Sequence, residues 1–149
     1  MGKVSRADVG LLILRIGLGL LFLFYGSQKM FGVLGGRGYS SQIDAFIGQG
    51  FPPLLAHLAI LTEFLGGLML LVGFVTPLAA LGLTVMMTVA TWKHMSQPDA
   101  WNLLLTSGQG GDISRFFYTF MLAVACLALL VMGPGKISLD SKFFRGKKP

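Results

Sequence analysis

Glu63 is the residue whose type and position most directly suggest chemistry in this sequence. It stands near the middle of an apolar run that extends from Leu54 to Phe74. An ionisable group inside a transmembrane segment is so costly that it must face the protein interior or water and find a partner. A carboxyl group held in this way can also accept and release protons. We therefore take Glu63 as the candidate proton relay.

Other polar side chains are expected at a similar depth. Side chains tilt toward the N-terminus of their own helix, so Tyr25, in the run from Val9 to Phe31, is expected only ~4–5 Å from Glu63 along the membrane normal. His57 lies about one turn inside the run that contains Glu63, and a third run closes on Trp92-Lys93-His94. The candidate ligand-binding residues are Tyr25, Gln28, Lys29, His57, Trp92 and His94.

Arg15 is the obvious charge partner for Glu63, yet helix geometry argues against a simple pair. Arg15 is expected ~9 Å inside one end of its helix and Glu63 ~16 Å inside the same end, with side chains that tilt away from each other. We therefore treat Arg15 as a structural charge partner. A direct bridge, a water-bridged contact and a side chain that extends toward the headgroups all stay open.

Other familiar kinds of site find little support. The two histidines, with methionines such as Met30 or Met95, lack metal-ligand spacing, so no metal site is predicted. Cys126 is the single cysteine and stands in an apolar run, where it is typically a packing residue. The sequence has no haem-ligand pair, no iron–sulfur cysteines and no dinucleotide fingerprint, so no covalently held cofactor is implied.

The elements that must position these residues are membrane helices. Of the 149 residues, 54% are hydrophobic and 12% are charged, with a mean hydropathy of +0.73, which leaves too little polar surface for a soluble domain. Apolar runs of about 20 residues suit helices that cross ~30 Å of hydrocarbon. The sequence therefore predicts an all-α integral membrane protein, a single antiparallel four-helix bundle over residues 1–149, with spans at about 9–31, 54–74, 78–95 and 116–132.

The connections between the predicted spans are unequal. Only Val75-Thr76-Pro77 joins the second and third spans, and proline suits the first turn of a helix, so a tight hairpin is expected. In the first external loop, Ser41-x-x-Asp44 predicts the capped start of a short interfacial helix that ends at Gly48. Gly133-Pro134-Gly135 is expected to stop the last span.

Lysine and arginine residues indicate the orientation in the membrane. Seven flank the termini, Lys3, Arg6, Lys136, Lys142, Arg145, Lys147 and Lys148, and four lie on the opposite side, Lys29, Arg37, Lys93 and Arg115. By the positive-inside rule, both termini are predicted in the cytoplasm. The basic tail, residues 136–149, is expected to contact anionic lipid, so the net charge of +6 requires no nucleic-acid partner.

Several motifs taken together resemble the DoxX family. They are Leu14-Arg15-Ile16-Gly17, Gln28-Lys29-Met30-Phe31-Gly32, Glu63-Phe64-Leu65-Gly66-Gly67 and Gly133-Pro134-Gly135-Lys136-Ile137-Ser138-Leu139-Asp140. Their order and spacing on four predicted spans cover nearly the whole chain. The resemblance implies a small multi-pass protein of the bacterial or archaeal inner membrane. Arg15, Lys29 and Glu63 match charged motif positions of the family, for which the resemblance supplies no agreed catalytic role.

The resemblance also implies a class of function. Members of this family are associated with the quinone level of respiration, including a thiosulfate:quinone oxidoreductase and a terminal quinol oxidase, and with membrane complexes that handle oxidative stress. The chain would then be a membrane subunit of such a complex, at most an oxidoreductase subunit whose electrons come from a protein partner. A quinone-type pocket should have Tyr25, His57, Glu63 and His94 around one cavity open to lipid, with Lys29 at its edge.

Two other classes of function stay open. The chain could be a non-catalytic assembly or scaffold subunit, because lysine, tryptophan and histidine at this depth are also ordinary interfacial anchors. It could be a carrier of a small solute or of protons, whose sign would be a water path from Arg15 to Glu63. The sequence also allows homo-oligomers without specifying one.

Overall fold

The computed structural model describes residues 3–96 and 111–143, and all regular structure in these residues is helical. The helices are α1 (Arg6–Phe31), α2 (Tyr39–Gly48), α3 (Pro53–Val72), α4 (Thr76–Met95), α6 (Gly111–Met132) and α7 (Leu139–Phe143). The predicted all-α class is confirmed for this part of the chain. Each predicted span coincides with one long helix, α1, α3, α4 or α6, apart from differences at the ends.

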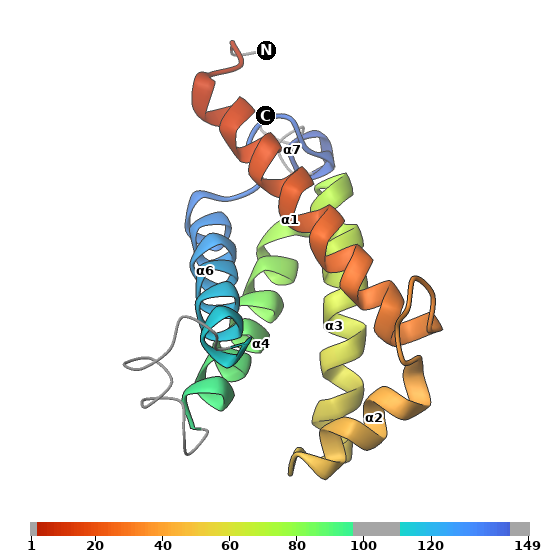
Figure 1. Ribbon diagram of the computed structural model, residues 1–149. Helices are drawn as coiled ribbons and strands as arrows, with labels where there is room; N and C mark the ends of the chain where they lie inside the picture. The colour runs from red at the N-terminus through yellow and green to blue at the C-terminus, as the bar shows by residue number, and fades with distance from the viewer. Residues whose placement is uncertain (1–2, 97–110, 144–149) are drawn as a thin grey trace.

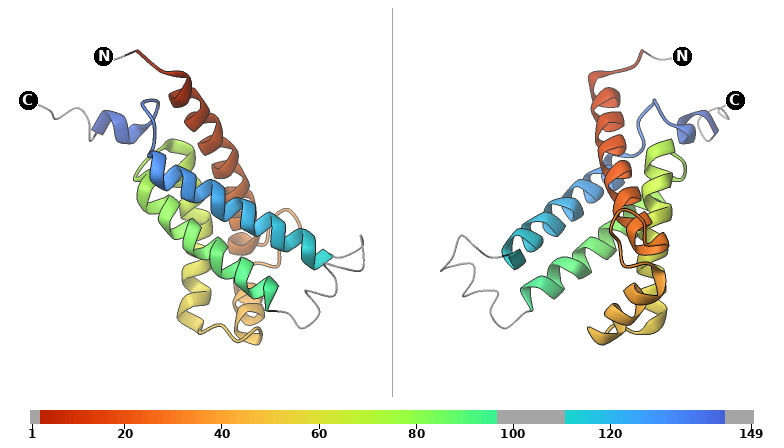
Figure 2. Two further views of the ribbon diagram at one scale, coloured as in Figure 1. Left: turned by 90° about the vertical axis from the view of Figure 1, so that its left-hand side faces the viewer. Right: turned by 45° about the vertical axis from the view of Figure 1, so that its right-hand side comes forward.

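The four long helices form two antiparallel pairs (Figure 1). α1 packs along α3 and α4 packs along α6, whereas α3 meets α4 over a shorter length and α1 meets α6 very little. The pairs converge where α1 begins and α7 lies, and they diverge toward the opposite end (Figure 1 and the right view of Figure 2). We call the end where the pairs converge the terminal end, and the opposite end, which carries α2, the loop end. A bundle packed evenly on all sides is therefore not confirmed.

Small residues explain why α1 and α3 lie so close together. A Cβ atom added at Gly26 would lie 2.6 Å from the Cα atom of Phe64, and one added at Gly67 would lie 2.5 Å from the backbone nitrogen of Leu23. No side chain fits at either place, so the two backbones are in direct contact. Close approach of this kind drives helix association in lipid, where burial of apolar surface gives little advantage.

Three of the described helices are long and apolar enough to cross a membrane, namely α1, α3 and residues 114–132 of α6. α4 has 20 residues but is more polar, because it contains four threonines and ends with Lys93 and His94. Three of the threonine hydroxyls donate to the carbonyl four residues earlier, at distances of 2.6–2.8 Å, and so are satisfied inside the helix. That α4 also crosses the membrane stays a prediction.

The short helix expected in the first long loop is present as α2, but it starts differently. It begins at Tyr39 after Gly38, and no side chain caps it, so Ser41 lies inside the helix rather than ahead of it. Ile43 of α2 is buried against Ala56 and Ile60 of α3, which fixes α2 at the loop end. Its placement at the membrane interface stays a prediction.

The segment that follows α6 closes the terminal end. Gly133 has a φ of +78° directly after the last residue of α6, as expected of a helix terminator. Asp140, at the start of α7, accepts hydrogen bonds from the backbone nitrogens of Val75 (2.6 Å) and Thr76 (2.8 Å), so it caps the first turn of α4. Its own backbone nitrogen donates to the carbonyl of Gly73 (2.9 Å). We call residues 133–140 the C-terminal strap.

Candidate functional site

The centre of the site is an ion pair between α1 and α3. The ammonium group of Lys29, in the last turn of α1, donates to the carboxylate of Glu63, near the middle of α3. Glu63 is only 4% exposed, whereas a quarter of the Lys29 side chain is exposed. An ion pair of this kind is weakly screened, and loss of either partner would leave a costly charge behind.

Close contact of the two backbones sets the position of this pair. Gly26 touches Phe64, the residue that follows Glu63, and Lys29 stands about one helical turn beyond Gly26. The small residue therefore lets α3 approach α1 closely at the depth where the two charges meet. A side chain at position 26 would push α3 away and lengthen the ion pair.

A pair of tyrosines extends the site to α6. The rings of Tyr25 and Tyr118 meet edge to face, with centroids 6.2 Å apart, and both residues are about 40% exposed. We therefore take as the candidate site one carboxylate, one ammonium group and two hydroxyl groups, which come from three helices.

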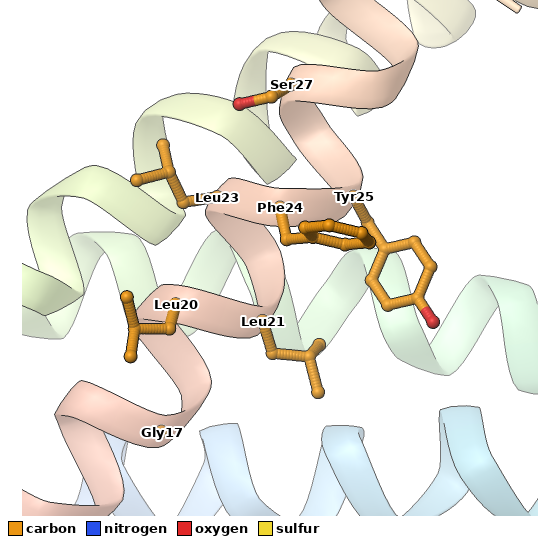
Figure 3. A pocket seen from close by; sticks show the side chains of 7 residues that line it. All are labelled: Gly17, Leu20, Leu21, Leu23, Phe24, Tyr25 and Ser27. Atoms are coloured by element: carbon orange, nitrogen blue, oxygen red, sulfur yellow. The ribbon is translucent and has the colours of Figure 1, made fainter. Parts of the chain in front are cut away.

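A shallow apolar groove lies on α1, and Tyr25 is the one residue of the site that lines it. It is lined by Gly17, Leu20, Leu21, Leu23, Phe24, Tyr25 and Ser27. Figure 3 shows the side chains of Leu20, Leu21 and Tyr25 standing out from α1, with the Tyr25 hydroxyl group at the free end of its side chain. The groove is open along its length, so a molecule dissolved in the bilayer could enter it from the side.

Comparison with known proteins identifies the group to which the chain belongs. The DoxX family model matches residues 10–95. Two proteins of Escherichia coli (strain K12), inner membrane protein YphA and inner membrane protein YqjF, are each 32% identical to the chain, over 139 and 136 residues, which are 93% and 89% of the chain and 93% and 91% of the relatives. The chain belongs to the DoxX family. Putative oxidoreductase CatD of Bacillus subtilis (strain 168) is 27% identical over 143 residues, 95% of this DoxX chain and 92% of the relative. No solved structure matches this DoxX protein.

The family and the apolar helices together place this DoxX protein in the inner membrane. The matches with YphA and YqjF cover nearly the whole length of both proteins in each comparison. The family match includes Arg15, Lys29 and Glu63.

Arg15 of this DoxX protein lies at the other end of the molecule from the site. Its Nη1 and Nη2 atoms donate to the carbonyls of Pro134 (3.1 Å) and Ile137 (2.7 Å), and the side chain is 1% exposed. The direct bridge to Glu63 is therefore not formed, and the guanidinium group is buried beneath the C-terminal strap. The sequence could not indicate this arrangement, because the acceptors are backbone carbonyls far away in the chain.

The remaining candidate residues divide into two groups. Lys29 pairs with Glu63, and Tyr25 contacts Tyr118, whereas His57 contacts Tyr39 of α2, with 2.6 Å between Nδ1 and the hydroxyl oxygen. Gln28 donates to the carbonyl of Leu34 (2.9 Å) and so steadies the loop after α1. Trp92 is 68% exposed and, with His94, ends α4. The α1 groove contains Tyr25 but not His57, Glu63 or His94, so these four do not surround it.

The sequence analysis missed one residue of the site, Tyr118, and the partner of one candidate residue, His57. Tyr118 stands at the loop end of the last span, where a tyrosine reads as an ordinary interfacial residue, and only the contact of α1 with α6 reveals its partner. Tyr39 lies in the long connection between the first two predicted spans, and no sequence pattern indicates that it contacts His57. Within residues 3–96 and 111–143, no group of three or more histidine, cysteine or acidic side chains is arranged to hold a metal ion.

Proposed function

We propose that this DoxX protein is a membrane subunit of a quinone-linked redox complex in the inner membrane. The observation that supports this most strongly is the ion pair of Lys29 with the buried Glu63 on α1 and α3, together with the contact of Tyr25 with Tyr118 and the apolar groove on α1 that Tyr25 also lines. A quinone needs these features, an apolar path for its tail and a few convergent polar groups for its ring. The oxidoreductase name of the Bacillus subtilis relative points in the same direction.

Each residue of the site has a role in this proposal. The tail of the quinone lies along Gly17 to Phe24, and the hydroxyl groups of Tyr25 and Tyr118 donate to its ring carbonyls. Reduction to the quinol takes two electrons and two protons. The electrons come from a protein partner, because the sequence has no ligands for a redox centre. Glu63, paired with Lys29, passes the protons.

We also propose that α4 is the fourth span and that both termini are cytoplasmic. The hydroxyl groups of Thr84, Thr88 and Thr91 are satisfied within α4, which makes this helix compatible with lipid, and its antiparallel packing along α6 puts it at the same depth as an apolar helix long enough to span. The distribution of lysine and arginine supports the orientation.

A scaffold role is the second candidate, and a specific observation favours it. Two buried charged residues already have partners, Glu63 in Lys29 and Arg15 in two backbone carbonyls, so each has a structural explanation without a ligand. In that case the groove on α1 holds only ordinary lipid.

Binding of a quinone analogue to the purified protein in nanodiscs separates the two candidates. Tyr25→Phe should weaken binding by about 1 kcal/mol, roughly five-fold, because one hydrogen bond is lost. Tyr39→Phe is the matched control, since it removes the same hydroxyl group outside the α1 groove and should leave binding unchanged. Lack of saturable binding to the wild type would leave the scaffold role.

A further inference from the structure

The terminal end of the molecule exposes four cationic side chains. Lys3 and Arg6 come from the start of α1, Lys136 from the C-terminal strap and Lys142 from α7. These segments are far apart in the sequence, but the strap joins them, because the backbone nitrogen of Lys136 donates to Asp8 (2.9 Å) and its ammonium group donates to the carbonyl of Lys3 (2.9 Å). In all three views the start of α1 and α7 lie at one end of the molecule (Figures 1 and 2).

The acidic side chains at this end are turned inward. Asp8 is 8% exposed and accepts from the backbone nitrogen (2.8 Å) and the hydroxyl group (2.7 Å) of Ser5 as well as from Lys136. Asp140 is 6% exposed and caps α4. In the described part of the terminal end, the outer face therefore carries cations and no exposed carboxylate.

Apolar side chains stand beside these cations. Val4 and Phe143 are largely exposed, and Ile137 is partly exposed, each within a few residues of Lys3, Lys142 or Lys136. A cation next to an exposed apolar side chain suits the boundary between headgroups and acyl chains, where each finds its own solvent. A face turned to bulk water would gain nothing from the exposed Phe143.

We infer that Lys3, Arg6, Lys136 and Lys142 form a binding surface for the headgroups of anionic phospholipids, with Val4, Ile137 and Phe143 in the adjoining acyl region. The charge of the face complements such headgroups, and the helices that enter the bilayer immediately below hold the face at headgroup depth. Attraction to an anionic surface corresponds to roughly a five-fold change in affinity for each lysine or arginine. This surface is independent of the quinone site, which lies toward the loop end.

The test is lipid-dependent stability of the delipidated full-length protein in detergent. Phosphatidylglycerol added to the micelles should raise the melting temperature, whereas phosphatidylcholine should raise it much less. The double variant Arg6→Gln/Lys142→Gln should need about 25-fold more phosphatidylglycerol for the same shift, because two cations are lost. Both side chains are exposed and are separate from the contacts of Asp8, Arg15 and Asp140, so the fold should be retained.

Arg37→Gln is the matched control, because Arg37 is an exposed cation at the loop end, in the connection between α1 and α2. It should titrate like the wild type. Equal stabilisation by the two lipids, or an unchanged titration of the double variant, would overturn the inference. A single-stranded oligonucleotide that displaces phosphatidylglycerol at low concentration would also overturn it, because the face would then be a nucleic-acid surface.

Discussion

Glu63 contributes to this protein through its pairing with Lys29. Glu63 is almost fully buried, so its charge has no ready access to water as an alternative partner, whereas a quarter of the Lys29 side chain is exposed. Removal of one member of such a pair leaves the other uncompensated, whereas removal of both does not. The energetic coupling between the two positions is therefore a direct measure of the pair.

A double-mutant cycle should show this coupling. We expect Glu63→Ala alone to lower the stability in detergent by about 1–3 kcal/mol, and Glu63→Gln to cost less because the amide can still accept from Lys29. The double variant Lys29→Met/Glu63→Leu should cost less than the sum of its single variants. The measurement is thermal or chemical unfolding of each variant, and strictly additive effects would mean that the two residues do not interact.

At the scale of single residues, the sequence predicted positions better than partners. Glu63, Lys29 and Tyr25 were recognisable because ionisable or hydroxyl groups in apolar runs stand out. The pairing was missed, since Lys29 read as an interfacial anchor and Arg15 as the nearest charge partner. Which of two cations reaches a carboxylate depends on the helix contacts at Gly26, and hydropathy does not report these.

Gly26 of α1 lies against α3, whereas Gly17 of the same helix has open space beside it. Gly26→Ala places a Cβ atom 2.6 Å from the backbone of Phe64, so the helices must separate and the Lys29–Glu63 pair must lengthen. Gly17→Ala is the matched control on the same helix, because a Cβ atom there meets nothing within 4 Å. We expect Gly26→Ala to lower the melting temperature. Gly17→Ala should leave the melting temperature unchanged or raise it, because alanine favours a helix over glycine by up to about 1 kcal/mol of free energy. Similar losses from both would contradict the close contact.

The C-terminal strap is the element that joins the two helix pairs at the terminal end. Asp140 caps α4, and Arg15 of α1 holds the carbonyls of Pro134 and Ile137. Asp140→Ala should cost about 0.5–2 kcal/mol, the usual value of a lost helix cap, and Asp140→Asn should cost less because its carbonyl oxygen still accepts. Lys142→Ala in the same short helix serves as the control in thermal unfolding. A neutral Asp140→Ala would show that the strap does not stabilise the turn.

The helices themselves were predictable, whereas the strap was not. Long apolar runs ended by glycine and proline gave the four long helices nearly at their observed ends, because an interrupted backbone is not tolerated in lipid. Gly133-Pro134-Gly135 was recognised only as a terminator. Its further role depends on Arg15 and Asp8, more than a hundred residues earlier, and no local pattern records such contacts.

At the scale of the whole molecule, the two helix pairs are joined at the terminal end and diverge toward the loop end. The candidate site lies between them in the diverging half, where Tyr25 of one pair meets Tyr118 of the other. The antiparallel order of the long helices requires that both termini lie on one side of the membrane if all four cross. Orientation and span number can therefore be tested together.

A reporter fused after Pro149 should be cytoplasmic, and a short tag inserted within residues 35–38 should be accessible from outside intact cells. A second tag between residues 97 and 110 should also be external, because α4 and α6 would otherwise form a re-entrant pair. Protease and labelling experiments on spheroplasts provide the measurement. An external C-terminus would reverse the orientation, and an internal tag at 97–110 would mean that α4 does not cross.

The central claim is that a quinone-type molecule binds along α1 beside the Lys29–Glu63 pair, and photoaffinity labelling tests it most directly. A photoreactive short-chain quinone would be bound to the protein in nanodiscs, irradiated and mapped by peptide mass spectrometry. The account predicts label on α1 between Gly17 and Ser27 and on the peptide that contains Tyr118, lost when an excess of unlabelled quinone is present. Label that is spread over α2 and the exposed faces of α4, or that unlabelled quinone does not displace, would contradict it.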